Sequence, residues 1–164
     1  KPLVDNKGDK MIISRLGLKR KVDILASPDI DLSKAIRQWD KDVELVDCVL
    51  ADEAQFFTTP QIDQLFNLSV EHAIPVICYG IRTDFQKKLF PGSKRLFELA
   101  HSLEELKTIC RCGSKALFNG RKQHGKFVFD GNQIAVDGAS EIQYESLCGK
   151  CYARELKIAS SEKK

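Results

Sequence analysis

Two adjacent carboxylates, Asp52 and Glu53, follow directly on the apolar run of residues 46–51. This run predicts a buried strand, and open α/β sheets bind their ligands at the carboxyl ends of strands. In a nucleotide site, one carboxylate would position Mg²⁺ while the other takes a proton from an attacking hydroxyl or water. The alternative is a strand that ends in an exposed acidic turn without chemistry. These residues alone leave both interpretations open.

Four of the six cysteines form a C-x-C and a C-x-x-C pair: Cys110, Cys112, Cys148 and Cys151. Two close pairs of thiolates are typical of a tetrahedral zinc site, and four sulfur ligands leave no open coordination position. We therefore predict a structural zinc, with four free thiols as the alternative. Cys48 and Cys78 stand singly in apolar runs, and we expect them to be small buried thiols.

Residues 120–126 match most of the phosphate-binding loop pattern. However, Phe127 stands where a Ser or Thr is needed to hold Mg²⁺, and the residues after it predict a strand instead of a helix. We interpret this segment as a basic hairpin turn. Residues 1–164 then contain no true phosphate loop.

The carboxylates need elements that hold them in place. Periodicity and capping signals predict helices over residues 31–40, from a cap at Thr59 to Val70, and over residues 92–100. Strands are predicted over residues 21–25, 46–51, 75–79 and 105–109. A strand, a helix and a strand of these lengths form a right-handed crossover with parallel strands. We therefore expect Asp52 and Glu53 to lie beside residues 80–85.

After Cys110 the sequence pattern changes from long helical and strand segments to short strand-like pieces. Short strand-like pieces at residues 127–129 and 133–136, separated by a turn signal, predict a small β lobe closed by the cysteine pairs. The expected organisation is an α/β core over residues 1–109, a zinc lobe over 110–156 and a polar tail over 157–164.

Composition sets outer limits. A chain of 164 residues suits one domain with a small appended lobe. A net charge of +3 gives no broad field for binding polyanions. No apolar stretch reaches the length of a membrane span and no signal peptide is visible, so we expect a cytosolic protein without a membrane partner.

With these pieces in place, the sequence resembles the type II thymidine kinases over nearly its whole length. The segments that carry the resemblance are residues 1–5, 14–17, 52–56, 78–85, 92–96, 106–113 and 144–151. They include Asp-Glu-Ala-Gln-Phe at the acidic motif and Cys-Tyr-Gly-Ile-Arg-Thr-Asp-Phe in the central core. The resemblance implies a P-loop NTPase-like (RecA-like) α/β fold with a parallel sheet and a C-terminal zinc-ribbon lobe.

The resemblance also implies an activity. Such kinases transfer the γ-phosphate of ATP to the 5′-hydroxyl of thymidine or deoxyuridine, which salvages pyrimidine nucleosides for DNA synthesis. It implies Mg²⁺ with ATP, a structural zinc and a cytoplasmic homotetramer that binds no nucleic acid.

Site residues follow from the same resemblance. Glu53 is the implied general base, and Asp52, Ala54 and Gln55 accompany it on the Mg²⁺–ATP side. A lid over residues 133–144 is expected to grip the base largely through backbone groups. The implied nucleoside contacts are Phe85, Phe90, Gln133, Ile134, Ala135, Val136, Asp137 and Tyr144. Plain core packing is the alternative for Phe85 and Phe90, and covering the zinc site is the alternative for Tyr144.

The sequence departs from the family in three places that matter, the first being Lys7, which stands where the family usually has an arginine. The phosphate loop is absent, so we expect it to lie upstream of Lys1 and expect residues 1–164 alone not to bind ATP normally. The segment from Asp137 to Tyr144 is longer than in the family, which leaves the lid contacts around Asp137 open.

Two rival functions remain at this stage. A helicase-like ATPase is one, because residues 52–55 also resemble the D-E-A-x box, although the chain is short for a second motor lobe. A zinc-ribbon module that binds nucleic acid is the other, because basic residues lie close to the cysteines: Arg111, Lys115, Arg121 and Lys122.

Overall fold

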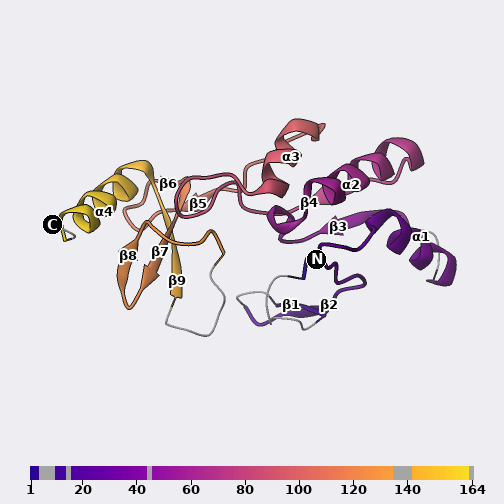
Figure 1. Cartoon of the computed structure of the whole chain (residues 1–164), viewed down its shortest axis with the longest axis horizontal. Coiled ribbons are helices and arrows are strands. Elements are labelled where there is room, and N and C mark those ends of the chain that lie inside the picture. The colour runs from indigo at the N-terminus through magenta and orange to yellow at the C-terminus, as the bar shows by residue number, and fades with distance from the viewer. Residues whose placement is uncertain (4–9, 14–15, 44–45, 135–141, 163–164) are drawn as a thin grey trace. The chain divides into compact units, whose positions relative to one another are not determined.

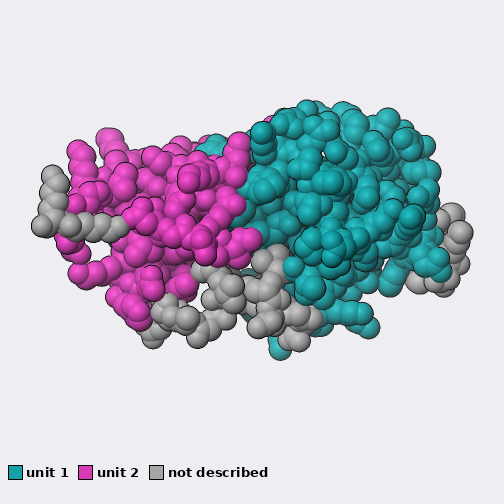
Figure 2. All heavy atoms as spheres, viewed as in Figure 1, with its two compact units in different colours: residues 1–82, 90–101 teal, residues 83–89, 102–164 magenta. Residues whose placement is uncertain are grey.

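The computed structural model describes residues 1–3, 10–13, 16–43, 46–134 and 142–162. The chain divides into two compact units, the first formed by residues 1–82 and 90–101 and the second by residues 83–89 and 102–164 (Figure 2). The acidic motif belongs to the first unit and the four paired cysteines to the second. Residues 102–109 pack in the second unit, whereas the sequence prediction began the zinc lobe at Cys110. The predicted division of labour between the two parts stays a prediction.

The first unit is built around a pair of parallel strands, β3 (Val49–Ala51) and β4 (Val76–Cys78). Helix α2 (Thr59–His72) connects them, as the predicted crossover requires (Figure 1). Two further helices, α1 (Leu32–Val43) and α3 (Pro91–Leu99), belong to the same unit. Its buried core consists of Ala26, Leu32, Ile36, Ala51, Ala54, Phe57, Ile62, Leu65 and Leu68.

Local hydrogen bonds fix where α2 begins. The Thr58 hydroxyl accepts from the Gln61 backbone N–H, and the Gln61 side chain accepts from the Thr58 N–H, which completes a capping box. Gln61 also donates to the carbonyls of Ser27 and Ile30. The predicted cap at Thr59 is therefore wrong by one residue, because the hydroxyl that accepts from the N–H of the third helical residue, Gln61, belongs to Thr58.

A small antiparallel hairpin, β1 (Met11–Ile13) and β2 (Lys19–Lys21), precedes this sheet. The strand predicted over residues 21–25 is wrong beyond Lys21, the last residue of β2. The Val22 N–H donates to the Lys10 carbonyl and Ala26 pairs with Pro2 in an isolated bridge, so the segment between them runs outside regular structure. Its apolar residues pack without forming a ladder.

The second unit contains a three-stranded antiparallel sheet in the order β8 (Lys126–Val128), β7 (Phe118–Gln123), β9 (Ile142–Leu147). A two-stranded ribbon, β5 (Thr108–Ile109) and β6 (Lys115–Ala116), and helix α4 (Gly149–Ser161) complete it (Figure 1). The strand predicted over residues 105–109 is thus reduced to its last two residues. Helix α4 also continues through most of the predicted tail.

The hairpin between β7 and β8 turns at His124 and Gly125, which both have positive φ, 49° and 77°. Two consecutive residues of this conformation form the turn whose twist matches that of the flanking strands. The predicted basic hairpin at residues 120–126 is confirmed. The predicted strand at residues 133–136 is wrong at Gln133 and Ile134, which lie in bends, and its other two residues lie outside the described ranges.

No helix within the described ranges combines the length and the apolar character that crossing a membrane requires.

Candidate active site and metal centre

Asp52 and Glu53 follow β3 directly, as predicted, and Glu53 caps the short 3₁₀ helix η1 (Ala54–Phe56). Glu53 has φ 52° and ψ 38°, in the left-handed region. A residue with a β-carbon adopts this conformation at a cost of about 1 kcal/mol or more, and such strain gathers at functional sites. The strained backbone places the Glu53 carboxylate at the solvent-exposed end of the strand.

The side chain of Gln55 connects the acidic motif after β3 to the residues after β4; we call this region, residues 52–55 and 79–81, the acidic corner. The Gln55 side chain is 1% exposed, and its Nε2 donates to Oε2 of Glu53 at 2.6 Å. Its Oε1 accepts from the backbone N–H of Ile81 at 3.2 Å, and the Ala54 N–H donates to the carbonyl of Tyr79 at 2.8 Å. The expected proximity of the acidic motif to the residues after β4 is therefore confirmed at Tyr79–Ile81. Phe85, at the far end of that predicted segment, belongs to the second unit.

Glycines make the close packing of this corner possible. A β-carbon at Gly80 would lie 2.6 Å from Oε1 of Gln55. One at Gly92, in the first turn of α3, would lie 2.5 Å from the carbonyl oxygen of Ala54. The next residue, Ser93, donates its hydroxyl to the Ile81 carbonyl at 2.7 Å. Helix α3 thus packs its first turn directly on η1.

Phe90, one of the predicted nucleoside contacts, lies at the N-terminus of α3. It is 3% exposed, and its ring meets that of Phe56 edge-on with 5.3 Å between centroids. This packing is that of a core residue supporting η1. A contact with a nucleoside stays a prediction.

Phe85 lies in a tight turn of the second unit, between Thr83 and Leu89, which pair as an isolated bridge. Asp84, 3% exposed, holds the turn because its Oδ1 accepts from the N–H groups of Gln86 and Lys88, each at 2.8 Å. The Tyr152 hydroxyl donates to the Phe85 carbonyl at 2.6 Å. Phe85 itself is only 1% exposed.

Three of the remaining predicted nucleoside residues lie within the described ranges: Gln133, Ile134 and Tyr144. Gln133 donates its side-chain amide to the Leu89 carbonyl at 3.3 Å, whereas Ile134 is exposed. Tyr144, on β9, is 55% exposed. Ala135, Val136 and Asp137 lie outside the described residues.

Sequence reasoning missed that Arg121 is buried against two of the predicted nucleoside contacts, Phe85 and Tyr144. It is 5% exposed, and its guanidinium lies 3.7 Å from the centre of the Phe85 ring. It also bonds the Tyr144 hydroxyl and two backbone carbonyls. A buried arginine is rare without partners, but the sequence alone presented it as one more cation of a basic turn.

The four paired cysteines form one cluster, in which all four sulfur atoms lie within 4.8 Å of one another. Zinc–sulfur bonds of about 2.3 Å place the sulfurs of a tetrahedral site about 3.8 Å apart, and Sγ of Cys112 lies 3.6 Å from Sγ of Cys148. The donor set and its spacing therefore fit a structural zinc. None of the four forms a disulfide.

The turns around the cysteines prepare them for a cation. Gly113, at φ 84°, lets the first loop close with the Cys110 N–H on the Ser114 carbonyl. Cys148 caps α4, and its sulfur accepts from the Cys151 N–H. Hydrogen bonds from Ser114 lower the pKa of the Cys112 thiol to about 6.

The neighbouring sulfur of Cys112 raises the pKa of Cys151 to about 12. Thiols this close cannot all ionise without a positive charge among them. A zinc ion held by the four sulfurs would supply that charge.

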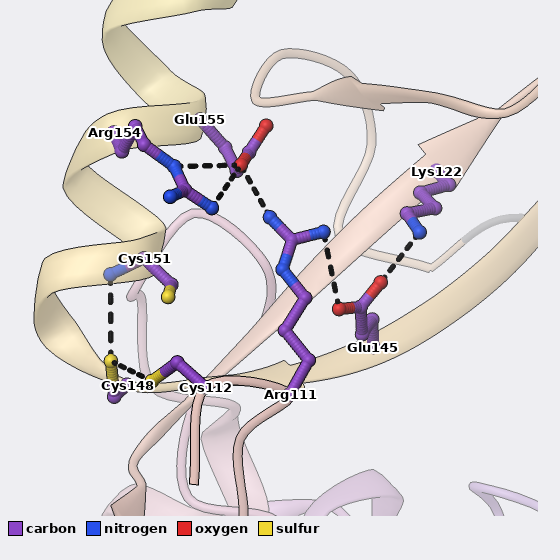
Figure 3. A network of polar contacts seen from close by, with 8 residues as sticks. All are labelled: Arg111, Cys112, Lys122, Glu145, Cys148, Cys151, Arg154 and Glu155. Atoms are coloured by element: carbon purple, nitrogen blue, oxygen red, sulfur yellow. Dashed lines mark hydrogen bonds and ion pairs between the residues drawn. The ribbon is translucent and has the colours of Figure 1, made fainter. Parts of the chain in front are cut away.

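Three cations near this cluster, Arg111, Lys122 and Arg154, are engaged in ion pairs (Figure 3). Arg111, between the first two cysteines, pairs with Glu145 of β9 and Glu155 of α4, and Lys122 of β7 pairs with Glu145 at 2.5 Å. Lys115 pairs with Glu105. Paired cations attract phosphate weakly, so the zinc lobe offers little of the free positive charge that a nucleic-acid module needs.

The two single cysteines differ from the prediction. Cys48 is exposed, so its predicted burial is wrong: it stands one residue before β3, whereas Val46 and Val49 on either side pack against the core. Cys78 is partly buried, and burial raises the pKa of its thiol to about 11.

Comparison with known proteins gives one consistent result. A family model described as thymidine kinase matches residues 2–152. The thymidine kinase of Enterobacteria phage T4 is 40% identical over 152 residues, which cover 92% of this chain and 76% of the phage protein. That of Vibrio vulnificus is 40% identical, with 94% and 79% covered, and that of Encephalitozoon cuniculi is 37% identical, with 99% and 74% covered. The chain belongs to the thymidine kinase family.

Proposed function

We propose that the protein is a thymidine kinase, which transfers the γ-phosphate of ATP to the 5′-hydroxyl of thymidine or deoxyuridine to give dTMP or dUMP. The family match over residues 2–152 carries this proposal. The strained carboxylate at the end of β3 agrees with it, since phosphoryl transfer needs a positioned group to accept the proton of the attacking hydroxyl.

Glu53 is the proposed general base. Its carboxylate is exposed to an incoming hydroxyl, and the hydrogen bond from Gln55 Nε2 at 2.6 Å fixes one oxygen and leaves the other to accept a proton. Asp52 is proposed to help hold Mg²⁺ with ATP. Ala54 and Gln55 are 0% and 1% exposed, so we assign them the role of shaping the corner beneath the two carboxylates.

The proposed fold is a P-loop NTPase-like parallel sheet to which β3 and β4 belong. Its support is the parallel register of these strands and the placement of both carboxylates at their carboxyl ends. Mg²⁺ would neutralise developing charge on the phosphates. Because residues 1–164 hold no phosphate loop, we propose that a protein limited to them turns over ATP poorly.

The nucleoside side is proposed to consist of Phe85, Tyr144 and the backbone around Gln133, with Phe90, Ile134, Ala135, Val136 and Asp137 as further proposed contacts. The zinc held by the four cysteines is proposed to be structural, since four thiolates leave it no position for substrate. The homotetramer implied by the resemblance stays a prediction that sedimentation velocity would test.

The decisive experiment measures ATP-dependent phosphorylation of thymidine by the whole natural protein and by Glu53→Gln. Glutamine keeps an oxygen for the bond from Gln55 but is no base, so kcat should fall by about a hundredfold or more while KM for thymidine changes little. Glu71→Gln, which neutralises an exposed carboxylate on α2, is the matched control and should behave as wild type. Wild-type turnover in Glu53→Gln would remove this residue from the mechanism.

A further inference from the structure

We propose that Arg121 is a positioning residue that orients the nucleoside-binding side chains of this kinase and fixes the direction in which Tyr144 donates its proton. This inference rests on the proposed function and extends it to a residue of the second unit. Arg121 lies on β7, the central strand of its sheet, directly opposite Tyr144 in the β7–β9 register.

The contacts of Arg121 use its whole planar head. Nη1 donates to the Asn132 carbonyl and Nη2 to the Gln133 carbonyl, each at 2.9 Å. Nε donates to the Tyr144 hydroxyl oxygen at 3.0 Å. The guanidinium carbon lies 3.7 Å from the centre of the Phe85 ring and 5.5 Å from that of Tyr144. The buried Arg121 therefore contacts three segments: the turn that holds Phe85, strand β9 at Tyr144, and the connection at residues 132–133.

A second set of bonds joins the same segments. Gln86, next to Phe85, donates to the Gly131 carbonyl at 2.9 Å, and Gln133 donates to the Leu89 carbonyl. These amide contacts are exposed, whereas Arg121 is 5% exposed. Hydrogen bonds from a charged group are stronger than those between neutral groups, and they become stronger still when buried away from water. Arg121 therefore contributes most to holding these segments together.

Only arginine meets this geometry. Three donors at fixed angles reach two carbonyls and a hydroxyl while the flat face covers a ring, and an ammonium group reproduces neither the fork nor the stacking. The role therefore depends on the shape of the head as well as on its charge.

The bond from Nε also determines what the Tyr144 hydroxyl can do. Because its oxygen accepts from Arg121, its own proton is directed elsewhere. With 55% of Tyr144 exposed, the hydroxyl is placed to donate to an acceptor oxygen of the bound nucleoside. Without Arg121, the hydroxyl would rotate freely and give up this preference.

The test compares wild type, Arg121→Lys, Tyr144→Phe and the double variant in the whole natural protein. Arg121→Lys should raise KM for thymidine by about tenfold or more, with KM for ATP and zinc content unchanged. Because Arg121 acts through the Tyr144 hydroxyl, adding Tyr144→Phe to Arg121→Lys should cost much less than Tyr144→Phe costs alone. Arg154→Lys, an exposed arginine on α4, is the control and should match wild type.

An unchanged KM for thymidine in Arg121→Lys, additive effects in the double variant, or a joint rise of both KM values with loss of zinc would overturn the proposal. If wild type phosphorylates no nucleoside, the proposed function fails by itself. Hydrogen exchange then decides the positioning role separately: faster exchange at residues 130–134 and 142–147 in Arg121→Lys supports it, and unchanged exchange refutes it.

Discussion

Replacing Gly92 with alanine should displace η1, and with it the proposed general base Glu53, without changing Glu53 itself. The new methyl carbon would lie 2.5 Å from the Ala54 carbonyl oxygen, 2.8 Å from that of Phe57 and 2.9 Å from that of Gln55. Carbon and carbonyl oxygen approach each other comfortably to about 3.3 Å. The worst contact is therefore too close by about 0.8 Å, and every atom in the way is backbone.

Overpacking of this kind costs about 1–3 kcal/mol where side chains can adjust. Since backbone must move here, we expect a loss of about 3 kcal/mol and a fall in Tm of about 6–12 °C. The shift of η1 acts on Glu53 directly, and a misplacement near 1 Å lowers turnover by about a hundredfold. Thermal and urea unfolding measure the first effect, and steady-state kinetics measure the second.

Gly149→Ala is the matched control, because it also adds a methyl group in the first turn of a helix. The nearest atom there is Cε2 of Phe118 at 3.7 Å, an ordinary contact, so we expect a change of no more than about 1 kcal/mol, in the stabilising direction. If Gly92→Ala remained within about 0.5 kcal/mol of wild type, the close packing of α3 on η1 would be refuted.

The thiols allow two further predictions. A chelator should remove one zinc per chain and lower Tm, whereas Cys48→Ser should leave metal content unchanged; a chain that retains its Tm without metal contradicts a structural role. In the zinc-loaded protein, iodoacetamide at pH 8 should modify Cys48 before Cys78, because Cys48 is exposed and burial raises the pKa of Cys78 to about 11. Peptide mass spectrometry should show Cys78 reacting only as the pH approaches that value, and equal rates at pH 8 would contradict its burial.

Much of the first unit could be predicted from sequence. The strand–helix–strand order around β3 and β4 is encoded by two apolar runs and the periodic helix between them, so their parallel pairing and the position of Asp52 and Glu53 followed. Errors occurred where periodicity carries no information. Cys48 sits in the same kind of apolar run as Cys78, and only the start of β3 at Val49 separates an exposed thiol from a partly buried one.

The clustering of the four cysteines was also predictable, because C-x-C and C-x-x-C pairs are the spacing typical of residues that share a metal ion. Arg121 was not. Its role depends on Phe85, Tyr144 and the carbonyls after Gly131, which come from three separate stretches of sequence. No local pattern distinguishes a buried arginine that faces them from the exposed cations beside it. Tertiary structure alone reveals this kind of residue.

Neighbouring residues of β9 serve opposite sides of the sheet: Tyr144 meets Arg121, and Glu145 meets Arg111 and Lys122. Inserting or deleting a single codon within β7 or β9 would exchange these partners. A carboxylate would then face the buried guanidinium, and a phenol would replace the anion between two cations. We therefore expect members of this family to differ in the residue types of these strands far more often than in the strands' lengths.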